Sequence, residues 1–319
     1  MIQILVNDGI EADGKLLLEG AGFTVDTNKI PQEDLMQRLP AYDAIIVRSA
    51  TQVRRDLIDA CPNLKIIARG GVGLDNIDVA YAKSKGIQII NTPAASSASV
   101  AELAMAHTLS LARFLQNGNR DMATGDFKKL KSAYAAGVQL RGKTFGIVGF
   151  GRIGQELARL ALGMGMKVVA SDPMIAEINL YLDIAGLPEA IAVPIQTTSF
   201  ENVLKQADFV SLHVPNLGKP LVGAAELAMM KKGAFLINCA RGGVVDESAL
   251  LESLNAGHLG GAGLDTFVGE PKPRTELLNH PKISVSPHIG AATTQAQANI
   301  GQELADKIIA HFATKKVVA

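Results

Sequence analysis

Short apolar runs alternate along the chain with longer segments of helical periodicity. In the first hundred residues these runs cover 2–6, 43–47, 65–69 and 87–90. Short runs of mostly apolar residues are typical of strands in a parallel sheet. The longer segments between them predict helices that cross from one strand to the next.

A second series of the same kind follows in the middle of the chain. Its predicted strands cover 144–151, 167–171, 208–214, 234–240, 260–265 and 282–286. Two series of strands and crossover helices predict an α/β protein built from two doubly wound, parallel-sheet domains.

Two helical segments have a pronounced apolar face. The first follows Pro93 and contains the capping box Ser99-x-x-Glu102, which predicts that a long helix starts here. Its buried face would hold Val100, Leu103, Ala104, His107, Leu111, Phe114 and Leu115. The second segment ends the chain, and its face is formed by Ile300, Leu304, Ile308, Ile309 and Phe312. A helix with such a face needs a surface to pack against.

Composition narrows the class of protein. The chain has 319 residues, 48% of them apolar, and its 31 basic residues balance 31 acidic ones. No charge run predicts binding to nucleic acid or to a membrane surface. The N-terminus lacks the features of a signal peptide, and two cysteines, Cys61 and Cys239, fit a reducing compartment. We therefore expect a cytoplasmic protein with a small-molecule substrate.

The most specific short motif is the glycine pattern GFGRIG between a predicted strand and a predicted helix. Glycines in this pattern allow a tight turn, a close approach of pyrophosphate to the backbone, and close packing of helix on strand. The helix N-terminus adds partial positive charge. The predicted dinucleotide contacts are Gly149, Gly151, Arg152, Ile153 and Gly154.

Asp172 ends the next strand, eighteen residues after Gly154. A carboxylate at this position can accept hydrogen bonds from both ribose hydroxyls and would repel a 2′-phosphate. Because no basic residue lies beside it in the segment SDPM, the sequence favours NAD over NADP. The same carboxylate can also cap the local backbone.

Three polar residues follow the ends of three successive predicted strands. They are Arg241 in NCARGG, Glu270 in FVGEP and His288 in SPHIG. Carboxyl ends of parallel strands meet at one edge of a sheet, where ligands bind. A histidine with a carboxylate behind it suits proton transfer, and an arginine suits the orientation of an anionic substrate. Of the other histidines, His107 is expected in the core, and His213 either lines the cofactor cleft or packs. No residues show the spacing of a metal site.

On these motifs the chain resembles the D-isomer-specific 2-hydroxyacid dehydrogenases over nearly its whole length. The matching stretches are 69–78, 91–103, 146–154, 231–250, 261–271 and 287–297. The resemblance implies that Arg241, Glu270 and His288 are catalytic. It also implies that Asp265, with the backbone at Cys239 and Ala240, faces the nicotinamide. Further expected cofactor contacts are His213, Val214, Pro215 and Gly290.

The resemblance also implies a domain plan. A Rossmann-type nucleotide domain, residues 98–286, would be inserted in a flavodoxin-like substrate domain formed by residues 1–97 and 287–319. The substrate would lie in the cleft, and the terminal helix would return to the first domain. Nucleotide domains of this family pair through long helices, here residues 99–120, so we expect a homodimer or homotetramer.

The identity of the hydroxyacid is less constrained. The segments VRSATQV and ARGGVGLDNID are most similar to the 3-phosphoglycerate dehydrogenase branch, without the C-terminal regulatory domain of its longer members. Candidate substrate contacts are Arg48, Arg69, Gly70, Gly71, Val72, Gly73 and Lys131. Residues 214–227 differ from the threonine-rich segment that is more common in this family, which affects the expected adenine contacts. Alternatives are a hydroxypyruvate or glyoxylate reductase, a D-lactate-type dehydrogenase, or an NAD-sensing binding protein similar to corepressors.

Overall fold

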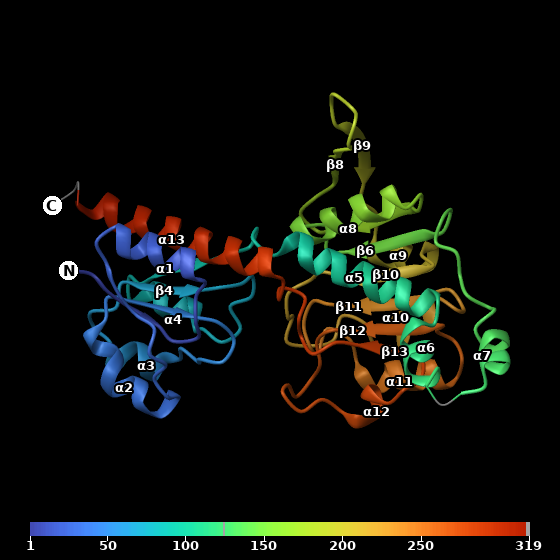
Figure 1. The fold of residues 1–319 in the computed structure, drawn as a ribbon, viewed down its shortest axis with the longest axis horizontal. Coiled ribbons are helices and arrows are strands. Elements are labelled where there is room, and N and C mark those ends of the chain that lie inside the picture. Colours follow the sequence, from blue (N-terminus) through green and yellow to red (C-terminus); the bar gives the residue numbers. More distant parts are fainter. Residues whose placement is uncertain (124, 317–319) are drawn as a thin grey trace. The chain divides into compact units, whose positions relative to one another are not determined.

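The computed structural model describes residues 1–123 and 125–316 of the chain. These residues form two compact units, each with its own parallel sheet (Figure 1). The smaller unit contains Met1–Ser96 and the segment from Ala291 onward, and the larger contains Ser97–Gly290. The boundaries expected from sequence, at 97/98 and 286/287, lie one and four residues away from these.

The sheet of the smaller unit has five parallel strands in the order β2-β1-β3-β4-β5. Its strands are β1 (Gln3–Val6), β2 (Thr24–Asp26), β3 (Ala44–Val47), β4 (Ile66–Arg69) and β5 (Gln88–Asn91). Its helices are α1 (Ala12–Gly20), α2 (Leu35–Arg38), α3 (Arg55–Ala60), α4 (Val79–Ser84) and α13 (Thr294–Lys316). This strand order is flavodoxin-like, as predicted.

The terminal helix α13 packs on one face of this sheet together with α1. Its predicted apolar face is confirmed, because Ile300, Leu304, Ile308 and Phe312 are buried in one cluster with strand residues such as Ile4 and Ile46. The two helices approach so closely that a Cβ on Gly14 would lie 2.7 Å from the Gly301 carbonyl oxygen. The opposite face is covered by α2, α3 and α4 through a second cluster that includes Leu35, Leu57 and Ala82.

The larger unit has six parallel strands in the order β13-β12-β11-β10-β6-β7. They are β6 (Thr144–Val148), β7 (Lys167–Ser171), β10 (Phe209–Leu212), β11 (Phe235–Asn238), β12 (Gly261–Leu264) and β13 (Ile283–Val285). Its helices are α5 (Ser97–Ala112), α6 (Leu115–Asp121), α7 (Phe127–Ala133), α8 (Arg152–Gly163), α9 (Phe200–Gln206), α10 (Ala224–Met229), α11 (Glu247–Asn255) and α12 (Thr275–Leu278).

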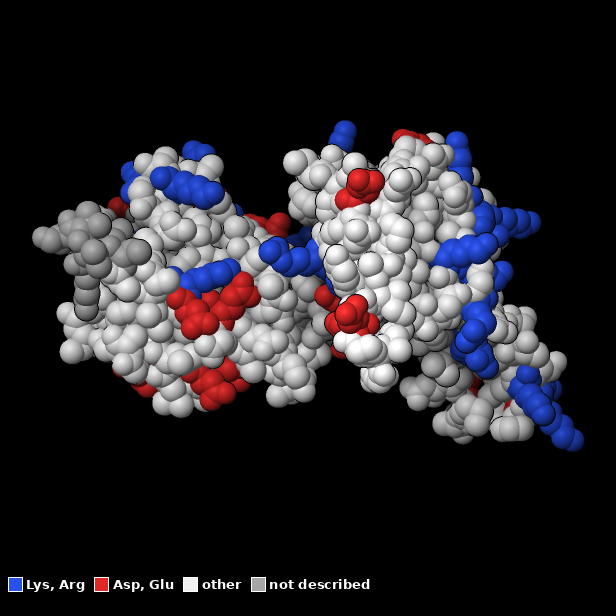
Figure 2. Space-filling model, turned by 90° about the horizontal axis from the view of Figure 1, so that it is seen from above, with Lys and Arg blue, Asp and Glu red and all other residues white. Residues whose placement is uncertain are grey.

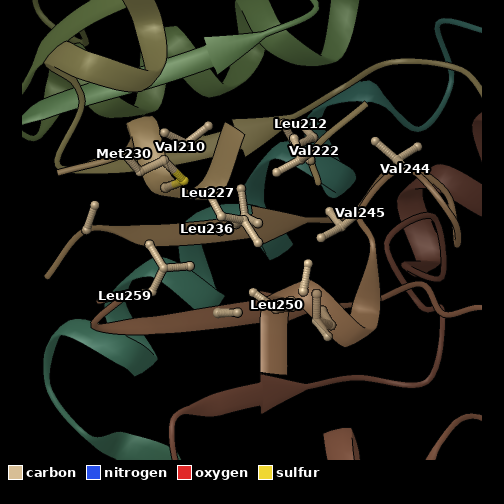
Figure 3. Packing of buried hydrophobic residues seen from close by; sticks show 14 of the residues in the cluster. Val210, Leu212, Val222, Leu227, Met230, Leu236, Val244, Val245, Leu250 and Leu259 are labelled. Carbon is tan, nitrogen blue, oxygen red and sulfur yellow. The ribbon is translucent and has the colours of Figure 1, made fainter. Parts of the chain in front are cut away.

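Helices cover both faces of this sheet. On one face, α5 and α8 bury Ala104, Leu157 and other apolar residues against Phe145, Ile147 and Phe209 of the strands. On the other, residues of α9, α10 and α11 such as Leu227 and Leu250 pack against strand residues such as Leu236 (Figure 3). Burial on both faces explains why these strands read as mostly apolar runs.

An antiparallel hairpin that the sequence did not predict follows β7. It consists of β8 (Glu177–Leu182) and β9 (Ile191–Gln196) and projects from the larger unit (Figure 1). After it, Thr197 forms a single parallel bridge with Ala170 of β7. This bridge occupies the place of the third strand of a Rossmann sheet, so the order of the unit is Rossmann-type with its third strand reduced.

The long helix predicted from residue 99 is wrong in both its start and its length. Helix α5 begins at Ser97, so Ser99 lies inside its first turn rather than at the cap. It ends at Ala112, and Phe114 adopts a left-handed conformation, φ 57°, before α6 begins. Leu115 is therefore turned away from the predicted face and is 60% exposed.

The balanced charge of the chain is unevenly distributed over the surface. On the face displayed in Figure 2, Lys and Arg side chains gather along one margin of the larger unit, whereas acidic side chains form small groups. Within residues 1–123 and 125–316, no helix is both long and apolar enough to cross a membrane.

Candidate active site

The glycine motif lies at the point where the strand order of the larger sheet reverses, between β6 and β10. In open α/β sheets this switch point is where ligands bind. Gly149 follows β6 with φ +88°, and a Cβ there would lie 2.4 Å from the carbonyl oxygen of His213, just after β10. Glycine is therefore required for the two strand ends to approach each other.

The start of α8 fits a dinucleotide pyrophosphate. A Cβ on Gly154 would lie 2.3 Å from the Gly149 carbonyl oxygen, so this glycine allows close packing of helix on strand. A Cβ on Gly151 would meet no described atom within 4 Å, which leaves open space beside the backbone. Gly151 is the N-cap of α8, and no side chain of the described residues caps it. The N–H groups of Arg152 and Ile153 in this first turn are thus suited to an anion.

Asp172 follows β7 and supports the glycine turn. Its Oδ2 accepts a hydrogen bond of 2.7 Å from the Phe150 backbone N–H, and its Oδ1 accepts one of 2.8 Å from Met174. Each carboxylate oxygen has a second lone pair, so the group can still accept ribose hydroxyls. Both functions expected from sequence, support of the backbone and a ribose contact, are compatible with this geometry.

His213 is a neutral residue at the wall of this switch point. Its Nε2 lies 3.0 Å from Ser211 Oγ, and its buried Nδ1 has no hydrogen-bond partner among the described residues. Burial lowers the pKa of His213 to about 4. The imidazole is therefore uncharged at neutral pH. Val214 is partly buried against the apolar cluster that includes Leu212 and Leu236, and Pro215 is exposed.

Glu270 and His288 form a hydrogen-bonded pair of ionisable groups at the carboxyl edge of the sheet. Glu270 Oε2 lies 2.7 Å from His288 Nδ1, and Glu270 Oε1 accepts a hydrogen bond of 2.8 Å from the Phe267 backbone N–H. They follow β12 and β13, which are neighbours in the sheet. The His288 side chain remains 47% exposed.

The loop that carries His288 is held by a buried carboxylate. Asp265 is 1% exposed and accepts hydrogen bonds from the backbone N–H groups of Ile289 and Gly290, at 2.8 and 2.9 Å, and from Ser286 Oγ at 2.6 Å. His288 itself has φ +55°, a left-handed conformation that costs free energy in a non-glycine residue. The bonds on either side of His288 offset that cost.

Arg241 follows β11, the next strand in the sheet. Its Nη1 donates a hydrogen bond of 2.7 Å to the Ala240 carbonyl, and its backbone carbonyl accepts one from Asn238. A Cβ on Gly242 would lie 1.9 Å from the Phe267 carbonyl oxygen, so the loop of Arg241 contacts the loop of Glu270 directly. The predicted convergence of Arg241, Glu270 and His288 at one sheet edge therefore has a structural basis.

Cys239 and Ala240 line the end of β11 and are nearly buried, at 7% and 8% exposure. Burial, with a contribution from the charge of Asp265, raises the pKa of the Cys239 thiol. The thiol is therefore protonated and unreactive, and the backbone here is the part that can face a ligand.

The predicted substrate contacts of the first domain lie together within the smaller unit. Arg69 ends β4, beside Val47 of β3, and Arg48 follows Val47. Arg48 Nε is buried and has no hydrogen-bond partner among residues 1–123 and 125–316. The Arg69 guanidinium lies against Gly71, because a Cβ on that glycine would be 3.0 Å from Nη1. Val72 and Gly73 complete this turn, whereas Lys131 is exposed on the short helix α7 of the larger unit.

Glu247 supports the loop of Glu270, a role that sequence reasoning missed. It opens α11, is 9% exposed, and its Oε1 accepts a hydrogen bond of 2.7 Å from the Val268 backbone N–H, two residues before Glu270. Burial raises the pKa of Glu247. A carboxylate directly after the cap Asp246 looks in sequence like part of an ordinary helix start, so no local signal identified it.

Among the described residues, no cluster of His, Cys, Asp and Glu could hold a metal ion.

The larger unit is a Rossmann-type domain with a dinucleotide site at its switch point and a His–Glu pair beside an arginine at the adjacent strand ends. These features define a nicotinamide-dependent dehydrogenase. Residues 105–290 match the family model described as D-isomer specific 2-hydroxyacid dehydrogenase, NAD binding domain. The chain belongs to this family, and it is an NAD-dependent D-2-hydroxyacid dehydrogenase.

Similar proteins lie within the same family. The chain is 41% identical to a hydroxypyruvate reductase of Thermotoga maritima, over 96% of this chain and 97% of that one. It is 38% identical to a D-3-phosphoglycerate dehydrogenase of Methanocaldococcus jannaschii, over 97% of this chain but 57% of that longer protein. The structure of a D-2-hydroxyisocaproate dehydrogenase superposes with a TM-score of 0.80 at 28% identity, covering 99% of this chain and 98% of the other.

Proposed function

We propose that this dehydrogenase interconverts D-3-phosphoglycerate and 3-phosphohydroxypyruvate, the entry reaction of serine biosynthesis. The observation that carries the redox part of the proposal is the contact of 2.7 Å between Glu270 Oε2 and His288 Nδ1. The proposed enzyme is cytoplasmic and assembles into homodimers or homotetramers through its larger unit.

His288 is the proposed acid and base. Its Nδ1 faces the Glu270 carboxylate, which can only accept a hydrogen bond, so Nδ1 carries the proton and Nε2 has the free lone pair. When the substrate hydroxyl is oxidised, Nε2 takes its proton, and the Glu270 carboxylate stabilises the resulting imidazolium. In the reverse direction Nε2 returns the proton to the oxygen. The turn from Gly149 to Gly154 and Asp172 would hold NAD, which would supply the hydride acceptor or donor for C2 of the substrate.

Arg241 is the proposed orienting residue. Its guanidinium is a planar fork of five N–H donors, which matches the geometry of the carboxylate and 2-oxygen of a 2-hydroxyacid. Donors fixed in advance stabilise the negative charge that develops on the 2-oxygen during reduction.

Arg48 and Arg69 are the proposed phosphate ligands. They follow neighbouring strands of the smaller sheet, and the turn from Gly70 to Gly73 begins at the same edge. Two guanidinium groups with a glycine-rich turn are suited to an oxyanion with three oxygens. The buried Arg48 Nε, which has no hydrogen-bond partner in the part of the chain that the structure describes, supports a ligand at this place.

A second candidate is hydroxypyruvate reduction. It is favoured by the identity of 41% to a hydroxypyruvate reductase of nearly equal length, against 38% to the phosphoglycerate dehydrogenase, of which the chain spans only 57%. In this case the two arginines would bind a carboxylate or serve the fold of the smaller unit.

Initial rates of NADH oxidation separate the candidates. The substrates are 3-phosphohydroxypyruvate, hydroxypyruvate, glyoxylate and pyruvate, and the proteins are wild type, Arg48→Ala, Arg69→Ala and the exposed control Arg55→Ala. We expect kcat/KM for the phosphorylated substrate to exceed the others and to fall at least about tenfold in the first two variants only. Equal or better rates with hydroxypyruvate, unchanged by the substitutions, favour the second candidate. NADH binding without turnover of any 2-oxoacid points to a binding protein.

A further inference from the structure

A buried histidine of the larger unit is hydrogen-bonded on both sides to serines of one strand segment. His107 lies in the middle of α5 and is 4% exposed. Its Nδ1 is 2.9 Å from Ser284 Oγ, and its Nε2 is 2.9 Å from Ser286 Oγ. Gly263 of β12 makes room for the ring, because a Cβ there would lie 2.7 Å from His107 Cβ.

One of these two serines connects the histidine to the loop of His288. Ser286 Oγ donates a hydrogen bond of 2.6 Å to Asp265 Oδ1. The same carboxylate accepts the backbone N–H groups of Ile289 and Gly290, which directly follow His288. The other serine, Ser284, sits within β13, and its hydroxyl is directed to the histidine rather than to Asp265.

The direction of the donors fixes the tautomer of His107. Because the single hydroxyl proton of Ser286 goes to Asp265, Ser286 Oγ can only accept from the imidazole, so His107 Nε2 carries a proton. Burial lowers the pKa of His107, which keeps the ring neutral, and Nδ1 then accepts from the Ser284 hydroxyl. Each hydroxyl in this chain of hydrogen bonds has one allowed direction.

We propose that His107 is a positioning residue for His288, acting through Ser286 and Asp265. The Nε2–H of His107 orients the Ser286 hydroxyl toward Asp265, and the oriented carboxylate holds the two backbone N–H groups that fix the left-handed turn at His288. Without the histidine, the Ser286 hydroxyl is free to rotate, and the Asp265 carboxylate loses an aligned donor. This inference rests on the proposed role of His288 as the acid and base.

The two serines provide a matched pair of variants. Ser286→Ala removes the connection between His107 and Asp265, whereas Ser284→Ala removes a hydrogen bond of equal length on the other side of the same ring. Each leaves one buried imidazole nitrogen without a partner, and Ser286→Ala also removes the donor to Asp265. A purely structural role of His107 predicts that kcat falls only in proportion to thermal stability in both variants.

The experiment compares both serine variants with His107→Leu and His107→Gln. We expect Ser286→Ala and His107→Leu to lower kcat for 2-oxoacid reduction about tenfold, with KM for NADH within about twofold of wild type. Ser284→Ala should change kcat by less than about twofold at a similar loss of thermal stability. His107→Gln, which can still donate near the position of Nε2, should recover part of the loss. The double variant of His107→Leu and Ser286→Ala should lose no more than either alone, because both break one chain.

Nitrogen-15 NMR of the histidine side chains gives a readout that does not depend on turnover. We expect the His107 ring to appear as the neutral Nε2–H tautomer, and the His288 ring resonances to shift in Ser286→Ala but not in Ser284→Ala. Equal changes of kcat and of the His288 resonances in both serine variants, or a His107 protonated at Nδ1, would overturn the inference. Wild type without any 2-oxoacid turnover, together with the expected NMR shifts, refutes the proposed function and leaves the positioning network intact.

Discussion

Glu270 Oε2 and His288 Nδ1 lie 2.7 Å apart, although eighteen residues separate them in the chain. They leave the carboxyl ends of β12 and β13, which pair in parallel, so the sheet itself brings them together. Both loops are anchored a second time. Glu270 Oε1 binds the Phe267 N–H, and Asp265 binds the backbone after His288. The pair is therefore preorganised before any substrate binds.

Replacing Glu270 with glutamine tests the carboxylate of this pair. Glu270→Gln keeps the size of the side chain but removes the charge that stabilises the imidazolium, so we expect kcat to fall about 100-fold. The affinity for NADH should stay near that of wild type. Steady-state kinetics and NADH fluorescence titration measure the two quantities. The control is Glu276→Gln on the exposed surface of α12, and a similar loss there would refute a specific role for Glu270.

Two glycines of the dinucleotide motif should respond differently to alanine. At Gly151 a Cβ meets no described atom within 4 Å, so Gly151→Ala should leave thermal stability unchanged and raise the Kd for NADH at least about tenfold. At Gly149 the added Cβ would lie 2.4 Å from a backbone oxygen, at φ +88°. Gly149→Ala should therefore lower the free energy of unfolding by more than about 2 kcal/mol.

Thermal unfolding and NADH titration of both glycine variants check this contrast. A Gly151→Ala protein that binds NADH as tightly as wild type would show that the pyrophosphate does not approach the backbone at this position.

Asp172 should determine the preference for NADH over NADPH. Asp172→Ala removes the carboxylate that repels a 2′-phosphate, so the ratio of kcat/KM for NADH to that for NADPH should fall about tenfold or more. Stability should fall as well, because the Phe150 N–H loses its acceptor. The comparison is Asp183→Ala, an exposed carboxylate beyond β8, which should keep the wild-type ratio. If the ratio is unchanged in Asp172→Ala, another residue determines the preference for NADH over NADPH.

His213 should make stability depend on pH. Its pKa is lowered from 6.5 to about 4 by burial, so between these values the unfolded chain binds more protons than the folded one. The stabilisation is present in full above pH 6.5 and is lost as the pH falls toward 4. From pH 7 to pH 5 the loss amounts to about 2 kcal/mol.

Urea unfolding of wild type and His213→Gln at the two pH values measures this contribution. His107 and His280 shift in the same direction, since burial lowers the pKa of each, and they remain in both proteins. The difference between wild type and variant therefore isolates His213. If both proteins lose the same free energy between pH 7 and pH 5, the imidazole of His213 is solvated in the folded state.

Much of the architecture was predictable from local patterns. Strands buried on both faces are largely apolar, and Arg241, Glu270 and His288 lie in the loops after three such strands. The turn at Gly149 and the carboxylate of Asp172 have fixed positions relative to their strands, so the dinucleotide site followed from spacing.

Other features depend on contacts that no local pattern encodes. The hairpin of β8 and β9 replaces a crossover in the Rossmann order. Its strands alternate between exposed and more buried positions because only one face is packed, so they lack the apolar runs by which the other strands were predicted. The break of the long helix at Phe114 occurs without proline or glycine at that position. The role of Asp265 in holding the loop of His288 appears only when β12 and β13 lie side by side.

The most direct test of this account is the rate of hydride transfer in His288→Asn. Asparagine tolerates the left-handed backbone of residue 288, so the loop should keep its conformation while the proton-transferring ring is lost. NADH oxidation is followed in a single turnover with saturating 2-oxoacid, beside NADH affinity at equilibrium. We predict an unchanged Kd for NADH and a transfer rate lower by about 100-fold or more. A rate within a few-fold of wild type would contradict the assignment of His288 as the acid and base.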